Sequence, residues 1–147
     1  MSASMSISAP DYGRSLSGLG FNLIVRDVDE ALRFATAVLG AELQFHTDAF
    51  AALTLCGQAF MLHQDMTYRN NALYGSLQSA DARGIGVELR AYGVDPDKAE
   101  ARAREQGFTV LAGSLDKPHG LREAMLLDGD GYLWIPSVHL PASSDAR

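Results

Sequence analysis

The sequence predicts an α+β fold made of two βαβββ modules, because one order of elements occurs twice along its 147 residues. In each copy a strand-like segment is followed by an aspartate, a helical segment, a glycine and three further strands. The aspartates Asp27 and Asp95 lie about 68 positions apart, and the glycines Gly40 and Gly107 lie about 67 apart. A repeat with a nearly constant period indicates two copies of one structural unit. We therefore expect the functional residues to lie between the two halves.

The first module begins with a strand over residues 20–25. Asp27 can cap the helix that follows, because its carboxylate can accept hydrogen bonds from the free amides of the first turn. Gly40 ends this helix, since glycine tolerates the left-handed conformation common at that position. A further strand and two strands that meet at Gly57 complete the module. Apolar side chains at helical spacing define the buried face of the helix: Ala31, Phe34, Ala35 and Val38.

The second module repeats these signals. A strand over residues 85–91 leads to Asp95, and Pro96 stands at the first helical position, where its missing amide costs nothing. Alanines interspersed with Glu, Lys and Arg then favour a helix up to Gly107. A further strand and two strands that meet at Gly131 follow.

Periodicity fails between Gln64 and Arg83, which predicts a crossover loop between the modules. Such a long loop is often functional, and a plain linker is the alternative. The first residues are Ser-rich and lack a basic region followed by an apolar run, so they are not a secretory signal and are interpreted as a frayed leader or an arm. The predicted boundaries are a flexible leader at 1–17, one domain at 18–138 with modules at about 18–65 and 84–138, and a C-terminal tail at 139–147.

The composition excludes several classes of partner. The net charge is −6 and no run of Lys or Arg is present, so nucleic acids and anionic membrane surfaces are not expected to bind. The apolar stretches are strand-sized and too short for a membrane helix. A single cysteine excludes an internal disulfide, which fits a reducing cytoplasm. That cysteine, Cys56, is interpreted as a small buried apolar residue and not as a nucleophile.

Two segments resemble a known family. Residues 22–34 are similar to the first module of the vicinal oxygen chelate superfamily and read Asn-Leu-Ile-Val-Arg-Asp-Val-Asp-Glu-Ala-Leu-Arg-Phe. This superfamily includes glyoxalase I, bleomycin-resistance proteins and extradiol dioxygenases. Residues 120–134 are similar to the signature of this superfamily near the end of the second module and read Gly-Leu-Arg-Glu-Ala-Met-Leu-Leu-Asp-Gly-Asp-Gly-Tyr-Leu-Trp. The resemblance spans residues 18–138. It implies curved mixed sheets that form an incomplete barrel around a cleft, and a homodimer. It does not give the function, because the superfamily contains different chemistries and metal-free binders.

The resemblance also indicates where a metal would bind. Metal-binding members place a His about seven residues before the helix-capping Asp of a module, and a carboxylate about four residues after its hairpin Gly. The corresponding residues here are Gly20 and Glu88 for the His positions, and Met61 and Ile135 for the carboxylate positions. One oxygen ligand, a thioether, an apolar side chain and a glycine do not form a divalent-metal site. We therefore expect no metal and no other cofactor.

Two of the four histidines are candidate site residues. His63 lies two residues beyond Met61, so strand alternation places it on the same face, toward the predicted cleft. One interpretation is that His63 is a base, a metal ligand or a hydrogen-bonding anchor. The other is that it is only a polar residue at the end of a strand. His119 stands in a loop that the family folds near its cavity, and either contacts a ligand or has a structural role. His46 is expected in a solvated turn, and His139 beyond the last strand.

Alternation also predicts which side chains line the cleft. Glu88 and Arg90 share a face, with Val87 and Leu89 under the helices, while Trp134 points away from Ile135 into the core. Glu88 and Arg90 either hold the polar end of a ligand or form an ion pair that closes an unused groove. The predicted ligand-binding residues are Asn22, Met61, His63, Glu88, Arg90, His119 and Ile135.

A mostly apolar cleft with a few polar groups is typical of a site for a small organic molecule. The preferred interpretation is therefore metal-independent binding of such a molecule. One alternative is a lyase or dioxygenase with a displaced metal site made from Glu88, His63 and His119. A further alternative is a protein-interaction module with a vestigial cleft.

Overall fold

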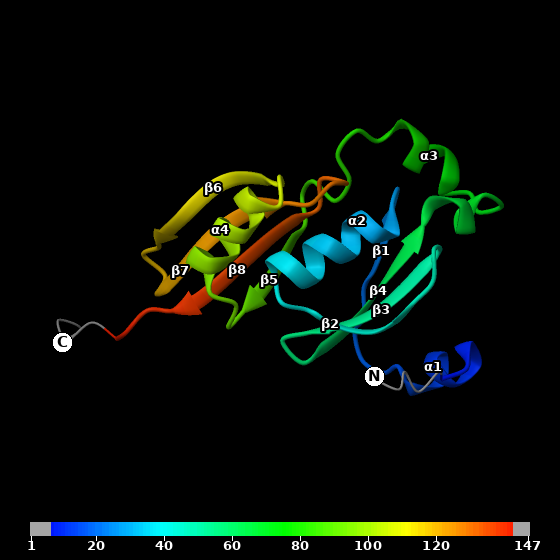
Figure 1. Cartoon of the computed structure of the whole chain (residues 1–147), viewed down its shortest axis with the longest axis horizontal. Helices are drawn as coiled ribbons and strands as arrows, with labels where there is room; N and C mark the ends of the chain where they lie inside the picture. Colours follow the sequence, from blue (N-terminus) through cyan, green and yellow to red (C-terminus); the bar gives the residue numbers. More distant parts are fainter. Residues whose placement is uncertain (1–6, 143–147) are drawn as a thin grey trace.

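Both predicted modules are present in the computed structural model, which describes residues 7–142 (Figure 1). The first consists of β1 (Asn22–Val25), α2 (Val28–Arg33) with a π-helical turn (Phe34–Val38), β2 (Glu42–His46), β3 (Phe50–Leu55) and β4 (Gln58–Gln64). The second consists of β5 (Glu88–Tyr92), α4 (Pro96–Glu105), β6 (Thr109–Asp116), β7 (Leu121–Leu127) and β8 (Leu133–His139).

The two modules have the same topology. Each forms a four-stranded sheet, in the order β1-β4-β3-β2 and β5-β8-β7-β6. The first strand of each module pairs in parallel with its last strand, and the other pairs are antiparallel. The α+β fold with two βαβββ units is therefore confirmed, and its two mixed sheets are not closed into a barrel.

The predicted caps form as expected. The Asp27 carboxylate accepts a hydrogen bond from the amide of Glu30, and that of Asp95 accepts from the amides of Asp97 and Lys98. These bonds satisfy donors that have no partner inside the helix.

The hairpin between β3 and β4 differs from one expectation. Its two loop residues, Cys56 and Gly57, both have positive φ, at 51° and 75°, as a type I′ turn requires. Cys56 is consequently exposed at the tip of the hairpin, and its assignment as a buried apolar residue is wrong.

The position predicted for Val87 under the helices is also wrong, because β5 begins one residue later and leaves Val87 57% exposed. His139 is the last residue of β8 and not beyond it.

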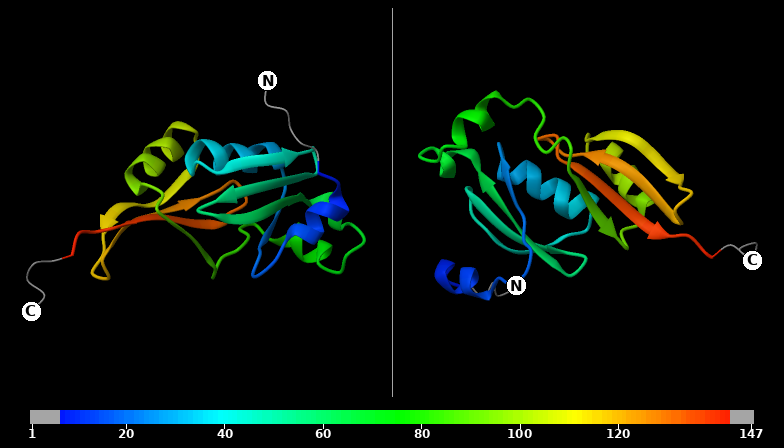
Figure 2. Two further views of the ribbon diagram at one scale, coloured as in Figure 1. Left: turned by 90° about the horizontal axis from the view of Figure 1, so that it is seen from below. Right: turned by 180° about the vertical axis from the view of Figure 1, so that it is seen from behind.

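One hydrophobic core joins the modules. Helices α2 and α4 lie on the same side of the two sheets, as Figure 2 shows. Phe34 meets Phe108 edge-to-face, with ring centroids 4.9 Å apart, and lies 6.3 Å from the ring of Trp134. Trp134 is 3% exposed and belongs to this core, as its alternation predicts.

The N-terminal segment contains a short helix, α1 (Ala9–Ser15), within the predicted leader; residues 1–6 of that leader lie outside the described part of the chain. Tyr12 packs against Phe45 and Phe50, with ring centroids 5.5 and 6.1 Å away. Since Phe50 lies on the face of the first sheet opposite the core, α1 covers that face. Within residues 7–142, no helix combines the length and the apolar character that crossing a membrane requires.

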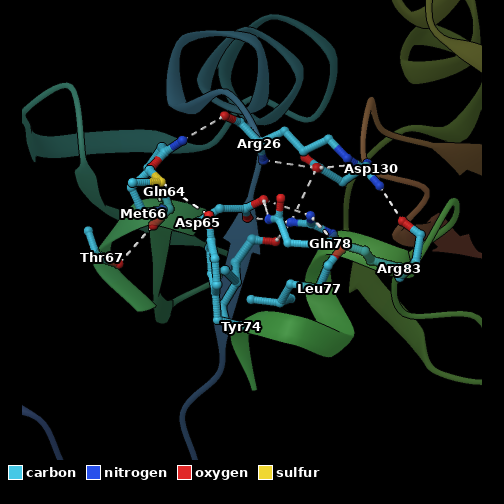
Figure 3. A network of polar contacts seen from close by, with 12 residues as sticks. Arg26, Gln64, Asp65, Met66, Thr67, Tyr74, Leu77, Gln78, Arg83 and Asp130 are labelled. Carbon is cyan, nitrogen blue, oxygen red and sulfur yellow. Dashed lines mark hydrogen bonds and ion pairs between the residues drawn. The ribbon is translucent and has the colours of Figure 1, made fainter. Parts of the chain in front are cut away.

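The crossover between the modules contains a 3-10 turn (Asp65–Tyr68) and α3 (Tyr74–Ser79), and a buried ion network anchors it (Figure 3). Arg83 donates to both carboxylate oxygens of Asp65, at 2.6 and 2.8 Å, and to the carbonyl of Ile24 at 3.0 Å. Its guanidinium lies 3.7 Å from Asp130 in the β7–β8 turn, which also pairs with Arg26 at 3.2 Å. The network connects the crossover to both modules.

Candidate functional site

Each sheet has a face turned away from the core, and we call these the first and second inner faces. On the first sheet, Leu23 and Leu62 point into the core. Because side chains alternate along a strand, Asn22, Met61 and His63 project from the first inner face. On the second sheet Trp134 points into the core, so the inner face carries Glu88, Arg90, Glu123 and Ile135.

A hydrogen-bonded chain holds His63 on the first inner face. The side-chain oxygen of Asn22 lies 2.7 Å from Nδ1 of His63, and its amide nitrogen donates to the hydroxyl of Tyr68 at 2.8 Å. Register explains the contact, because β1 and β4 run in parallel and place Ile24 opposite His63, with Asn22 two residues earlier. Since the Asn22 oxygen can only accept, Nδ1 carries the ring hydrogen and Nε2 keeps a lone pair.

The lone pair belongs to an uncharged ring. Burial lowers the pKa of His63, because the partly desolvated site disfavours the imidazolium. The ring is therefore neutral at pH 7. Nε2 makes no hydrogen bond to any residue in the range 7–142. His63 thus offers one oriented acceptor, which can receive a hydrogen bond or a proton.

This acceptor borders a cavity of about 590 Å³ between α1 and the first inner face. Tyr12, Phe45, Phe50 and Met61 are the largest of the other side chains that line it. The ring of His63 meets that of Phe50 edge-to-face, with centroids 4.7 Å apart. Met61 and His63, which strand alternation predicts on one face, line this cavity together.

The second inner face carries a linked set of charges. Arg90 donates to Glu88 at 2.7 Å and also pairs with Glu123, whose side chain is 9% exposed. His119 lies 3.4 Å from the same Glu123 oxygen. Hydrogen bonds to Glu88 and Glu123 raise the pKa of Arg90, so it stays charged. Burial works against ionisation of Glu123, yet Arg90 and His119 together hold its pKa below the usual value.

Glu88 and Arg90 border a second cavity, of about 330 Å³, together with Leu55, Cys56 and Trp134. Ile135 pairs with Arg90 across the ladder and is 1% exposed, so it supports the face more than it offers a contact surface. The predicted site residues therefore form two groups, one on each inner face. No hydrogen bond or ion pair joins the two groups within residues 7–142.

Several residues of the site were not predicted. Alternation along residues 121–127 could have located Glu123, since it lies opposite Ser137 on β8 and shares a face with Ile135. Tyr68 is in the crossover, where its ring predicts a stacking surface but not the hydrogen bond with Asn22, and Tyr12 is in the segment interpreted as a leader. Neither has a sequence signal that connects it to His63.

The residues present do not fit a divalent metal. Within residues 7–142, no group of three or more His, Cys, Asp or Glu side chains converges on one point. On the second inner face, the carboxylates of Glu88 and Glu123 both pair with the guanidinium of Arg90. A metal ion bound by these two carboxylates would have to displace that guanidinium.

Comparison with known proteins agrees with the fold. The family model of the Glyoxalase/Bleomycin resistance protein/Dioxygenase superfamily matches residues 19–135. A glyoxalase/bleomycin resistance protein/dioxygenase from Nocardioides has a similar structure, with 19% identity, a TM-score of 0.63, and 94% of this chain and 95% of that chain covered. A family enzyme from Burkholderia phytofirmans is 20% identical with a TM-score of 0.66, and the match covers 82% of this chain and 97% of that chain. The fosfomycin resistance protein FosX from Mesorhizobium loti is 15% identical with a TM-score of 0.60, and the match covers 86% of this chain and 95% of that chain. No curated protein sequence matches the chain.

Proposed function

Because this chain belongs to the Glyoxalase/Bleomycin resistance protein/Dioxygenase superfamily, we propose that it binds a small, partly apolar organic molecule without a metal ion. The observation that carries the proposal is the cavity of about 590 Å³ at His63, where one oriented, neutral acceptor stands in a mostly apolar wall. Concave, apolar spaces with a few fixed polar groups are typical of small-molecule sites.

A lyase or dioxygenase with a displaced metal site is the second candidate, and the donor set does not favour it. The required ligands would be Glu88, His63 and His119. Glu88 is paired with Arg90 on the second sheet, whereas His63 lies on the first sheet and uses Nδ1 to bond Asn22. A metal would therefore have to displace an ion pair and bring together residues of two separate faces. A protein-interaction module with a vestigial cleft is the third candidate.

Elemental analysis and a thermal-shift screen test the proposal together. We expect purified protein to carry no stoichiometric zinc, iron, nickel or manganese, and to be stabilised by members of a library of aromatic and amphipathic small molecules. About one divalent ion per chain, lost in Glu88→Ala or His63→Ala, would establish the metal-dependent alternative instead. A metal-free protein that no library member stabilises would favour the interaction module.

We also propose that the chain forms a homodimer in the cytoplasm. The exposed leucines of β6 support association, since Leu111 and Leu115 are 56% and 57% exposed and would gain from burial. Sedimentation velocity is expected to give twice the chain mass, and Leu111→Lys to shift the population toward monomer. A wild-type protein that sediments as a monomer at tens of micromolar would contradict the dimer.

A further inference from the structure

We infer that the cavity beneath α1 binds a planar aromatic molecule that carries an uncharged hydrogen-bond donor, and that α1 closes over this molecule as a lid. The inference rests on the proposed function and deepens it, because it assigns the ligand to one of the two cavities and gives its chemical class. The evidence is the aromatic wall, the acceptor on His63 and the way in which α1 is held.

The residues that line the cavity favour an aromatic, uncharged ligand. Tyr12, Phe45 and Phe50 contact one another with ring centroids 5.4 to 6.1 Å apart, and His63 continues the cluster from Phe50. Aromatic rings prefer offset-stacked and edge-to-face neighbours, which a flat ring system can provide. None of the residues that line the cavity is Asp, Glu, Lys or Arg, so an ion would lose its hydration without gaining a counter-charge.

His63 selects the polar group of the ligand. Its Nδ1 is engaged by Asn22, and Asn22 is in turn fixed by Tyr68, so the ring cannot easily exchange its tautomer. The available Nε2 is an acceptor, and burial keeps the ring uncharged. Its complement is an O–H or N–H group on the ligand, as in a phenol or an N–H heteroaromatic ring. Asn22 and Tyr68 act as positioning residues for His63.

The few contacts of helix α1 with the rest of the protein are those expected of a movable cover. It has no buried residue, and its hydrogen bonds to described residues all lie within residues 8–16. Its aromatic contacts with the sheet are those of Tyr12 with Phe45 and Phe50. The hydroxyl of Tyr12 is buried and has no hydrogen-bond partner within residues 7–142. The closed position therefore leaves one polar group unsatisfied, which opening of the helix or a ligand atom would relieve.

Naphthol and its methyl ether form a matched pair of probes, because they share the ring system and differ in the donor. Calorimetry on the wild-type protein is expected to give roughly tenfold tighter binding for naphthol, the ordinary effect of one net hydrogen bond. His63→Phe keeps an aromatic ring at this position and removes the acceptor, so it should bind both probes with similar affinity. Nitrogen-15 NMR should find hydrogen on Nδ1 of His63 in the wild type, and a mixture of tautomers in Asn22→Ala.

Tyr12→Ala tests the lid and is expected to increase the dissociation rate of naphthol several-fold in stopped-flow measurements. Tyr92→Ala is the control, since Tyr92 borders the other cavity and should leave binding unchanged. Equal affinity of the wild type for both probes, an unchanged preference in His63→Phe, or weaker binding only in Tyr92→Ala would overturn the inference. If naphthol fails to bind while the library yields another metal-free ligand, the inference falls and the proposed function stands.

Discussion

Replacement of Arg83 by alanine is expected to lower the free energy of unfolding by about 3–5 kcal/mol. The side chain of Arg83 is 4% exposed, and it neutralises Asp65 while its guanidinium also lies near Asp130. Both carboxylates have side chains no more than 10% exposed. Without Arg83, Asp65 would remain buried with no cation in contact, and its ionised form is costly in that environment. Chemical denaturation followed by circular dichroism measures the loss.

Arg26→Ala is the matched control. Arg26 pairs with the same Asp130, but its side chain is 42% exposed, and solvent screens exposed pairs strongly. We expect this variant to lose about 1 kcal/mol or less through its ion pair. A loss in Arg83→Ala no larger than that in Arg26→Ala would show that water replaces the guanidinium and that the network does not anchor the crossover.

The same network shows where sequence reasoning reaches its limit. Helix starts were predictable, because a cap such as Asp27 or Asp95 acts on amides two or three residues away. Strand faces were predictable for a similar reason, since alternation is a local property. Arg83 and Asp130 are 47 positions apart in sequence and meet only after the two modules have packed. No local pattern identifies such a contact.

The site was partly predictable for the same physical reason. Alternation correctly grouped Met61 with His63, and Glu88 with Arg90. It could not determine whether the two pairs face one another, because that depends on how the sheets are placed by the shared core. The packing of α1 on the first inner face was also not predictable, since α1 is a short helix without a buried residue.

Phe34→Ala is expected to cost about 3–5 kcal/mol, the usual range when a fully buried phenylalanine is truncated. Phe34 is 1% exposed and contacts rings of the second module, namely Phe108 and Trp134. The cavity left by the missing ring would therefore weaken the junction between the modules as well as the packing of α2. Phe45→Ala is the comparison, because Phe45 lies outside the shared core and its loss should be smaller.

The two variants also test whether the modules unfold as one unit. Trp134 is the only tryptophan, so its fluorescence reports the junction while circular dichroism reports both sheets. Coincident transitions in the wild type are expected, since one core spans both modules and small single domains usually unfold in a single step. In Phe34→Ala the fluorescence transition should shift to lower denaturant at least as far as the dichroism transition. A wild-type protein whose two probes separate would mean that each module is stable alone and that Phe34 contributes mainly within the first.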